Sequence, residues 1–95
     1  MFNFKKTVSH DLLNCIKALS PDVTLTEADV FSMFEYPPDA NLGDIAFPCF
    51  KLSRILRKAP AVIAQMIGRE FKSDVVSKVE SITGYLNIFV SGNYL

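Results

Sequence analysis

Residues 75–90 read VVSKVESITGYLNIFV, and this stretch contains the clearest fold signal in the chain. Residues 75–82 and 85–90 are both rich in β-branched and aromatic side chains, which favour strands. Thr83 and Gly84 separate the two runs, and a two-residue connection of this kind is typical of a β-hairpin. The sequence therefore predicts an antiparallel hairpin close to its C-terminal end.

The longer segments before this hairpin have helical periodicity. Apolar residues recur at helical spacing over residues 4–19, and a second apolar stripe predicts a helix over residues 46–57. Pro60 interrupts that stripe and suits the first turn of a third helix, over residues 60–72. We therefore expect an α+β fold, in which three main helices pack against a small antiparallel sheet ending in the β-hairpin.

The segment between the first two predicted helices has weaker signals. Thr24 and Glu27 have capping-box spacing, which predicts a helical turn over residues 25–31, and residues 32–36 are predicted to be a short strand. Residues 37–44 form the one long loop, since they concentrate turn-forming side chains. Within that loop we expect Gly43 to adopt a positive φ and Asp44 to cap the following helix.

Length and composition limit the classes of protein to consider. The 95 residues fit one domain, 49% of them are hydrophobic, and the formal net charge is zero. The charge is unevenly distributed: residues 1–50 contain three basic and seven acidic side chains, whereas residues 51–95 contain seven basic and three acidic ones. No apolar run is long enough to span a membrane. Two cysteines are too few for a disulfide framework, so we expect free thiols and a cytoplasmic location.

Residues for catalysis or metal binding are scarce. His10 is the single histidine and has no second ligand at metal-binding spacing, so no metal site is expected. Cys15 and Cys49 lie on apolar stripes without a neighbouring histidine base, as structural thiols do. We therefore assign no catalytic residue.

Three basic residues form a row on the predicted second helix. Lys51, Arg54 and Lys58 follow each other at i, i+3 and i+7, opposite the apolar stripe. Such a row is commonly the solvated face of a helix, and it also suffices to contact phosphates. Both interpretations stay open on the sequence.

The last predicted strand alternates between two kinds of side chain. Tyr85, Asn87 and Phe89 share one face, and the aliphatic residues between them share the other, which suits a core. An aromatic ring can stack on a nucleobase and a carboxamide can bond an adenine edge, so the first face is a candidate base-reading surface. The alternative is that these rings pack beneath a helix.

Two stretches resemble a known family when they are taken together. They are EYPPDANLGDIAFPCFKL (residues 35–52) and GYLNIF (residues 84–89), and both are similar to the N-terminal additional domain of arginyl-tRNA synthetases. Lys58-Ala59-Pro60 and Ile63-Ala64 also match the family pattern. The resemblance covers most of the chain and is weakest over residues 1–30.

The resemblance implies an appended α+β domain, residues 1–95, that recognises the outer corner of transfer RNA. Tyr85 and Asn87 match the family positions that recognise a base of the D-loop, and Gly43 and Asp44 match a turn that supports the fold. The implied partners are the D-loop of tRNA(Arg) and the rest of the synthetase chain.

The resemblance also implies a parent protein that is an ATP-dependent arginine–tRNA ligase. We expect the catalytic and anticodon-binding domains to be absent here, because the sequence contains neither His-x-Gly-His nor Lys-Met-Ser-Lys-Ser. ATP and arginine are then expected only in the missing catalytic domain, and no cofactor is expected in this chain. The competing hypothesis is a protein-interaction module with the same fold and no RNA binding.

Overall fold

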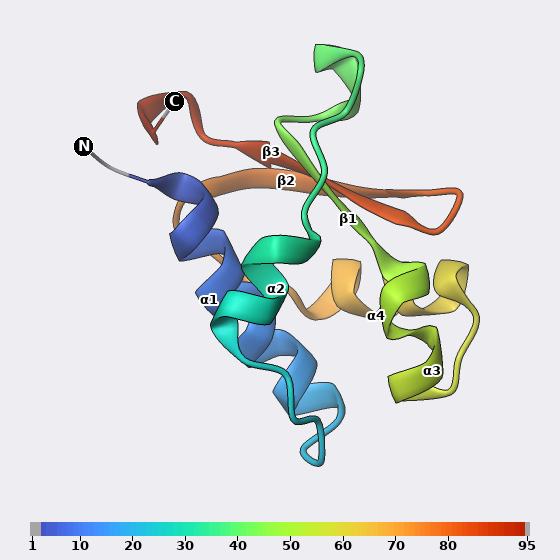
Figure 1. Ribbon diagram of the computed structural model, residues 1–95. Coiled ribbons are helices and arrows are strands. Elements are labelled where there is room, and N and C mark those ends of the chain that lie inside the picture. Colours follow the sequence, from blue (N-terminus) through green and yellow to red (C-terminus); the bar gives the residue numbers. More distant parts are fainter. Residues whose placement is uncertain (1–2, 95) are drawn as a thin grey trace.

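The chain forms one layer of helices against one small antiparallel sheet. The computed structural model describes residues 3–94, and Figure 1 shows the helices on one side of the sheet and the loop around residues 40–42 on the other. The sheet contains β1 (Ile45–Pro48), β3 (Tyr85–Val90) and β2 (Val76–Ile82) in that order, with β3 in the centre. The α+β fold with a C-terminal β-hairpin is confirmed. The elements are α1 (Phe4–Leu19), α2 (Glu27–Met33), β1 (Ile45–Pro48), α3 (Ser53–Leu56), α4 (Pro60–Glu70), β2 (Val76–Ile82) and β3 (Tyr85–Val90), with short 3-10 turns at Ala40–Leu42, Cys49–Leu52 and Gly92–Tyr94.

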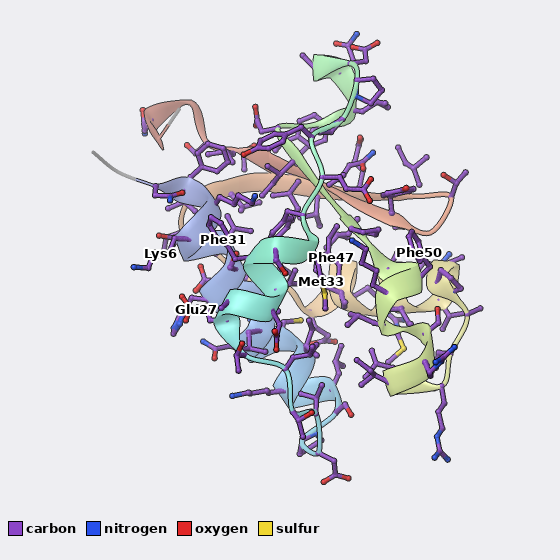
Figure 2. All side chains as sticks on the ribbon, in the orientation of Figure 1. Lys6, Glu27, Phe31, Met33, Phe47 and Phe50 are labelled. Atoms are coloured by element: carbon purple, nitrogen blue, oxygen red, sulfur yellow. The ribbon has the colours of Figure 1, made fainter. Side chains whose placement is uncertain are left out.

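The core lies between the inner face of the sheet and the helices. Leu86 and Ile88 of β3 are fully buried there, as the period-two alternation predicts. Phe47 of β1 lies between the sheet and the helices and packs edge-on against Phe34, with ring centroids 5.4 Å apart (Figure 2). Each fully buried side chain of this size contributes about 1.5–3 kcal/mol to folding.

The hairpin between β2 and β3 has the predicted two-residue connection. Thr83 and Gly84 both have positive φ, 48° and 84°, so the turn has the twist that matches the two strands. Gly84 also lies against α4, because an added Cβ would come within 3.0 Å of Pro60 Cβ. The hairpin therefore has little tolerance for a larger residue at position 84.

Thr83 is less suited to this turn than glycine or asparagine. A β-branched residue with φ of 48° is strained, whereas asparagine adopts this conformation readily. We expect Thr83→Asn to raise the free energy of unfolding by about 0.5–1 kcal/mol, which corresponds to roughly 2–8 °C in Tm for a domain of this size. Thermal unfolding measures the change, and Thr83→Val, which keeps the branched Cβ, should give no gain. A lower Tm for Thr83→Asn would contradict the turn assignment.

The predicted helix over residues 46–57 is wrong in its first half. Residues Ile45–Pro48 are strand β1, and only Ser53–Leu56 form a short α-helix, α3. The apolar spacing fits a helix, but β3 offers backbone partners to this segment, with Ile45 opposite Ile88. Pro48 is tolerated because it lies at the end of an edge strand.

The prediction for the preceding segment is also corrected. The helix α2 begins two residues later than expected, because Thr26 and Asp29 form the capping box, with hydrogen bonds of 3.1 and 2.9 Å. The predicted strand over residues 32–36 is absent, since α2 continues to Met33. Only Glu35 pairs with the sheet, through a bridge to Ala46 of β1.

The loop before β1 is attached to the centre of the sheet. Gly43 has φ of 116°, as expected, and the backbone N–H of Asp44 donates to the carbonyl of Ile88 over 2.9 Å. Asp44 does not cap a helix: its Oδ2 accepts from the backbone N–H of Val90 at 2.7 Å. The Gly-Asp pair therefore connects the loop to the end of β3.

The last helix agrees more closely with the helix predicted over residues 60–72. The helix α4 begins at Pro60 and ends at Glu70, two residues before the predicted end. It is separated from α3 by Arg57, whose φ of 54° ends the shorter helix. No helix within residues 3–94 has the length and apolar character needed to cross a bilayer.

Candidate nucleic-acid interface

A groove of about 310 Å³ lies on the outer face of the sheet, where the loop before β1 passes over β3. This volume is at the lower end of the range for small-ligand pockets, about 300–1,000 Å³. The floor comes from the sheet and the walls come from the loop and the hairpin tip. Its lining residues are Glu35, Tyr36, Pro37, Pro38, Leu42, Ala46, Ile82, Thr83, Tyr85 and Asn87.

Asn87 provides the polar floor of this groove. It is in register with Ala46 of β1 and Glu80 of β2, and only 5% of its surface is exposed. None of the side-chain hydrogen bonds within residues 3–94 uses its carboxamide, whose atoms are reachable from the groove that they line. A buried amide without a protein partner is costly unless water or a ligand satisfies it. The floor can therefore offer one donor and one acceptor to a bound group.

Tyr85 forms the wall next to this floor. Its ring is half-buried and packs edge-on against Phe50, with centroids 6.5 Å apart and planes at 82°. Phe50 lies on the turn that follows β1 (Figure 2). The Tyr85 hydroxyl lies 3.5 Å from Oε1 of Glu35. The ring is thus supported from its edge.

Phe89 shares the face of Tyr85 and Asn87 but does not line the groove. The ammonium of Lys78 lies 4.5 Å from its ring centroid, and Lys78 also pairs with Glu80 at 3.7 Å. Within the described part of the chain, Phe89 is therefore already engaged by a cation of the neighbouring strand.

The three basic residues predicted to share a helix do not do so. Lys51 lies in the 3-10 turn Cys49–Leu52, Arg54 lies in α3, and Lys58 follows the break that Arg57 introduces. All three are exposed, and Lys51 Nζ donates to the carbonyl of Met33 over 3.5 Å. No basic side chain of the described residues lines the groove. The groove and the cations are therefore separate features of the surface.

The two cysteines and the histidine, which are the residues with catalytic potential, lie in surroundings typical of structural side chains. Burial raises the pKa of the Cys15 thiol to about 11 and that of Cys49 to about 12, so both thiols are neutral near pH 7. His10 Nδ1 lies 3.0 Å from Oε2 of Glu27 and joins α1 to α2. Residues 3–94 contain no cluster of three potential metal ligands.

Apolar exposure around the groove was not evident from the sequence. Six large apolar side chains are exposed among the described residues, and four of them line the groove or contact Tyr85. An exposed patch of this kind indicates a binding surface. Those four are Tyr36 (69% exposed), Phe50 (52%), Ile82 (40%) and Leu42 (36%).

Glu35 is the second feature that the sequence reasoning missed. Its proximity to Tyr85 depends on contacts between residues 50 positions apart. The only sequence signal for Glu35 is its place in the loop motif, because periodicity does not reveal its proximity to Tyr85.

Comparisons with known proteins match nearly the whole chain. The profile of a family described as "Arginyl tRNA synthetase N terminal domain" matches residues 4–90. Arginine–tRNA ligases of Clostridioides difficile and Alkaliphilus metalliredigens are each 38% identical, over 100% and 98% of this chain and 16% of their own lengths. The solved arginyl-tRNA synthetase of Thermus thermophilus has the same fold, with a TM-score of 0.74, 23% identity, and coverage of 94% of this chain and 14% of its own. The chain thus spans about a sixth of the length of these curated relatives.

Proposed function

Since the chain belongs to the arginyl-tRNA synthetase N-terminal domain family, we propose that it is the part of an arginine–tRNA ligase that binds transfer RNA. The base-reading site is the groove of Tyr85 and Asn87, and its target is an unpaired base in the D-loop of tRNA(Arg). ATP and arginine are handled by the remainder of the longer protein.

The observation that supports this proposal is the carboxamide of Asn87 on the groove floor, which has no side-chain hydrogen-bond partner within residues 3–94. A carboxamide presents a donor and an acceptor side by side, as needed for two hydrogen bonds to one base edge. Tyr85 adds an aromatic surface for stacking, which tolerates any base. Because no cationic side chain of residues 3–94 lines the groove, it suits a base better than a phosphate. Unpaired loop bases are the ones that proteins can reach in this way.

The exposed cations serve the phosphates around that base. We expect Arg54→Ala and Lys58→Ala each to weaken the binding of all RNAs alike and to reduce the slope of log affinity against log salt by about one. Binding titrations at several salt concentrations measure this slope. Lys17→Ala, which removes an exposed cation from the last turn of α1, is the matched control and should leave it unchanged. Base-dependent losses for Arg54→Ala would contradict a phosphate role.

The proposal is tested by titrating the 95-residue chain with a tRNA(Arg) transcript and with the same transcript carrying the D-loop of a different tRNA. We expect the D-loop exchange to weaken binding at both low and moderate salt. Equal affinity for the two transcripts would overturn D-loop recognition. Absence of binding to either would favour the interaction module, for which the exposed apolar patch of Tyr36, Leu42, Phe50 and Ile82 would be the contact surface.

A further inference from the structure

We propose that Glu35 is a second base-reading residue, whose carboxylate accepts an N–H from an exocyclic amino group of the base that Asn87 binds. This inference rests on the proposed function, because it concerns the same groove. It adds a preference: a base with an amino group at this edge binds better than one with a carbonyl oxygen there.

The backbone places Glu35 in line with the groove floor. Its N–H donates to the carbonyl of Ala46 over 2.9 Å, and the N–H of Ala46 donates back over 2.8 Å. Ala46 is in turn directly opposite Asn87. Directly paired residues of antiparallel strands project to the same face, so Glu35, Ala46 and Asn87 form one row across the sheet.

Ala46 leaves space between the two polar side chains. Its methyl group is the smallest side chain that a chiral residue can place at the centre of the row. Adjacent strands are about 4.8 Å apart, so Glu35 and Asn87 are separated by roughly two strand spacings at the backbone. Both line the groove above the methyl group. A planar group lying there contacts the carboxamide on one side and the carboxylate on the other.

The carboxylate of Glu35 is available for such a contact. Its one hydrogen-bond partner within residues 3–94 is the Tyr85 hydroxyl, at 3.5 Å, which is long for an O–H···O bond. An ionised carboxylate is an acceptor only, with room for about four donors. Most of its capacity is therefore unused.

An acidic residue in an RNA site needs a specific explanation. RNA is a polyanion, so a carboxylate beside it raises the energy of the complex unless it accepts a hydrogen bond. An exocyclic amino group has two N–H bonds, one for the Asn87 carbonyl oxygen and one for Glu35. A carbonyl oxygen at that position would instead place its lone pairs against the carboxylate. The groove therefore selects for the amino group.

Glu80 is the natural control for this assignment. It lies on the other side of Asn87, directly opposite on β2, and its carboxylate is 3.7 Å from Lys78 Nζ. It does not line the groove. Replacing Glu80 by glutamine removes the same charge from the same sheet face without touching the proposed contact.

The experiment compares variants of the 95-residue chain on tRNA(Arg) transcripts altered at one D-loop position. That position is the one where an abasic nucleotide weakens binding to the wild type but not to Asn87→Ala. Transcripts carrying adenosine or inosine there differ in an amino group against a carbonyl oxygen. Glu35→Gln keeps a carbonyl oxygen that accepts from an amino group and adds an N–H that can donate to a carbonyl oxygen, so it should reduce the preference for adenosine over inosine by about 10-fold.

The controls separate a direct contact from indirect effects. Glu80→Gln should leave affinity unchanged or raise it, because only repulsion of RNA is removed. Tyr85→Phe, which loses the hydroxyl and keeps the ring, should retain the preference for adenosine; loss of that preference would show that Glu35 acts through Tyr85 and would overturn the inference.

Two outcomes distinguish failure of this inference from failure of the proposed function. If Asn87→Ala weakens binding while Glu35→Gln keeps the wild-type preference for adenosine over inosine, the inference alone is wrong. If no D-loop position shows coupling to Asn87, both the inference and the base-reading function are wrong.

Discussion

Replacing Gly43 by alanine is expected to lower the free energy of unfolding by about 2–4 kcal/mol. Gly43 has φ of 116° and ψ of 176°, a combination that is essentially restricted to glycine. An added Cβ would lie 3.0 Å from the carbonyl oxygen and 3.2 Å from the nitrogen of Ile88. Backbone strain and steric overlap therefore add.

The Gly43→Ala substitution should affect more than the loop, because Gly43 positions Asp44 against β3. Asp44 follows it, and both hydrogen bonds of Asp44 to β3 depend on the close approach of the loop to Ile88. Chemical denaturation and thermal unfolding measure the loss. Gly92→Ala is the matched control, since a Cβ there meets nothing within 4 Å. Equal stability of the two variants would show that the close approach at Ile88 does not constrain the fold.

Replacing Asn87 by alanine is expected to weaken binding of the cognate tRNA(Arg) by roughly 1–3 kcal/mol, or about 5- to 150-fold in affinity. Only 5% of the surface of Asn87 is exposed, and its carboxamide makes no side-chain hydrogen bond within residues 3–94, so its removal breaks no internal hydrogen bond. Tm should therefore change little while RNA affinity falls. A loss of stability as large as the loss of binding would contradict the role assigned to this side chain.

The Asn87 effect has a recognisable pattern across RNA variants. Asn87→Ala should relax the preference at one D-loop position, whereas Tyr85→Ala should cost a similar ~1–3 kcal/mol for every base, because stacking is tolerant of base identity. Asn14→Ala, an exposed amide change on α1, is the matched control and should have no effect. If Asn87→Ala binds wild-type and altered D-loops as tightly as the unmodified chain, the groove does not read a base.

Local signals in the chain were sufficient for several parts of the structure. The Thr83-Gly84 connection predicted the hairpin because only two residues separate runs of strand-forming side chains, and the observed φ values agree. The amphipathic spacing over residues 4–19 predicted α1 with its bounds, and Pro60 marked the start of α4. The positive φ of Gly43 was expected from turn chemistry alone. In each case the determining interactions lie within a few residues of one another.

The candidate site could be predicted only in part from local signals of this kind. Period-two geometry correctly placed Tyr85 and Asn87 on one face of the last strand. It also placed Phe89 there, and could not show that Lys78 from the neighbouring strand covers that ring. The position of Glu35 beside Tyr85 joins residues too far apart in the chain for any periodicity to report.

Tertiary pairing alone made residues 45–48 a strand. The spacing of Ile45, Cys49, Leu52 and Leu56 suits a helix, and a short apolar run satisfies helical and extended periodicity equally well. The outcome depends on β3, whose second edge has unpaired N–H and C=O groups that only an extended segment can satisfy. The same pairing places Ala46 between Glu35 and Asn87 and so creates the groove. Local propensity is worth a few tenths of a kcal/mol per residue, and the backbone pairing and burial of a whole strand exceed it.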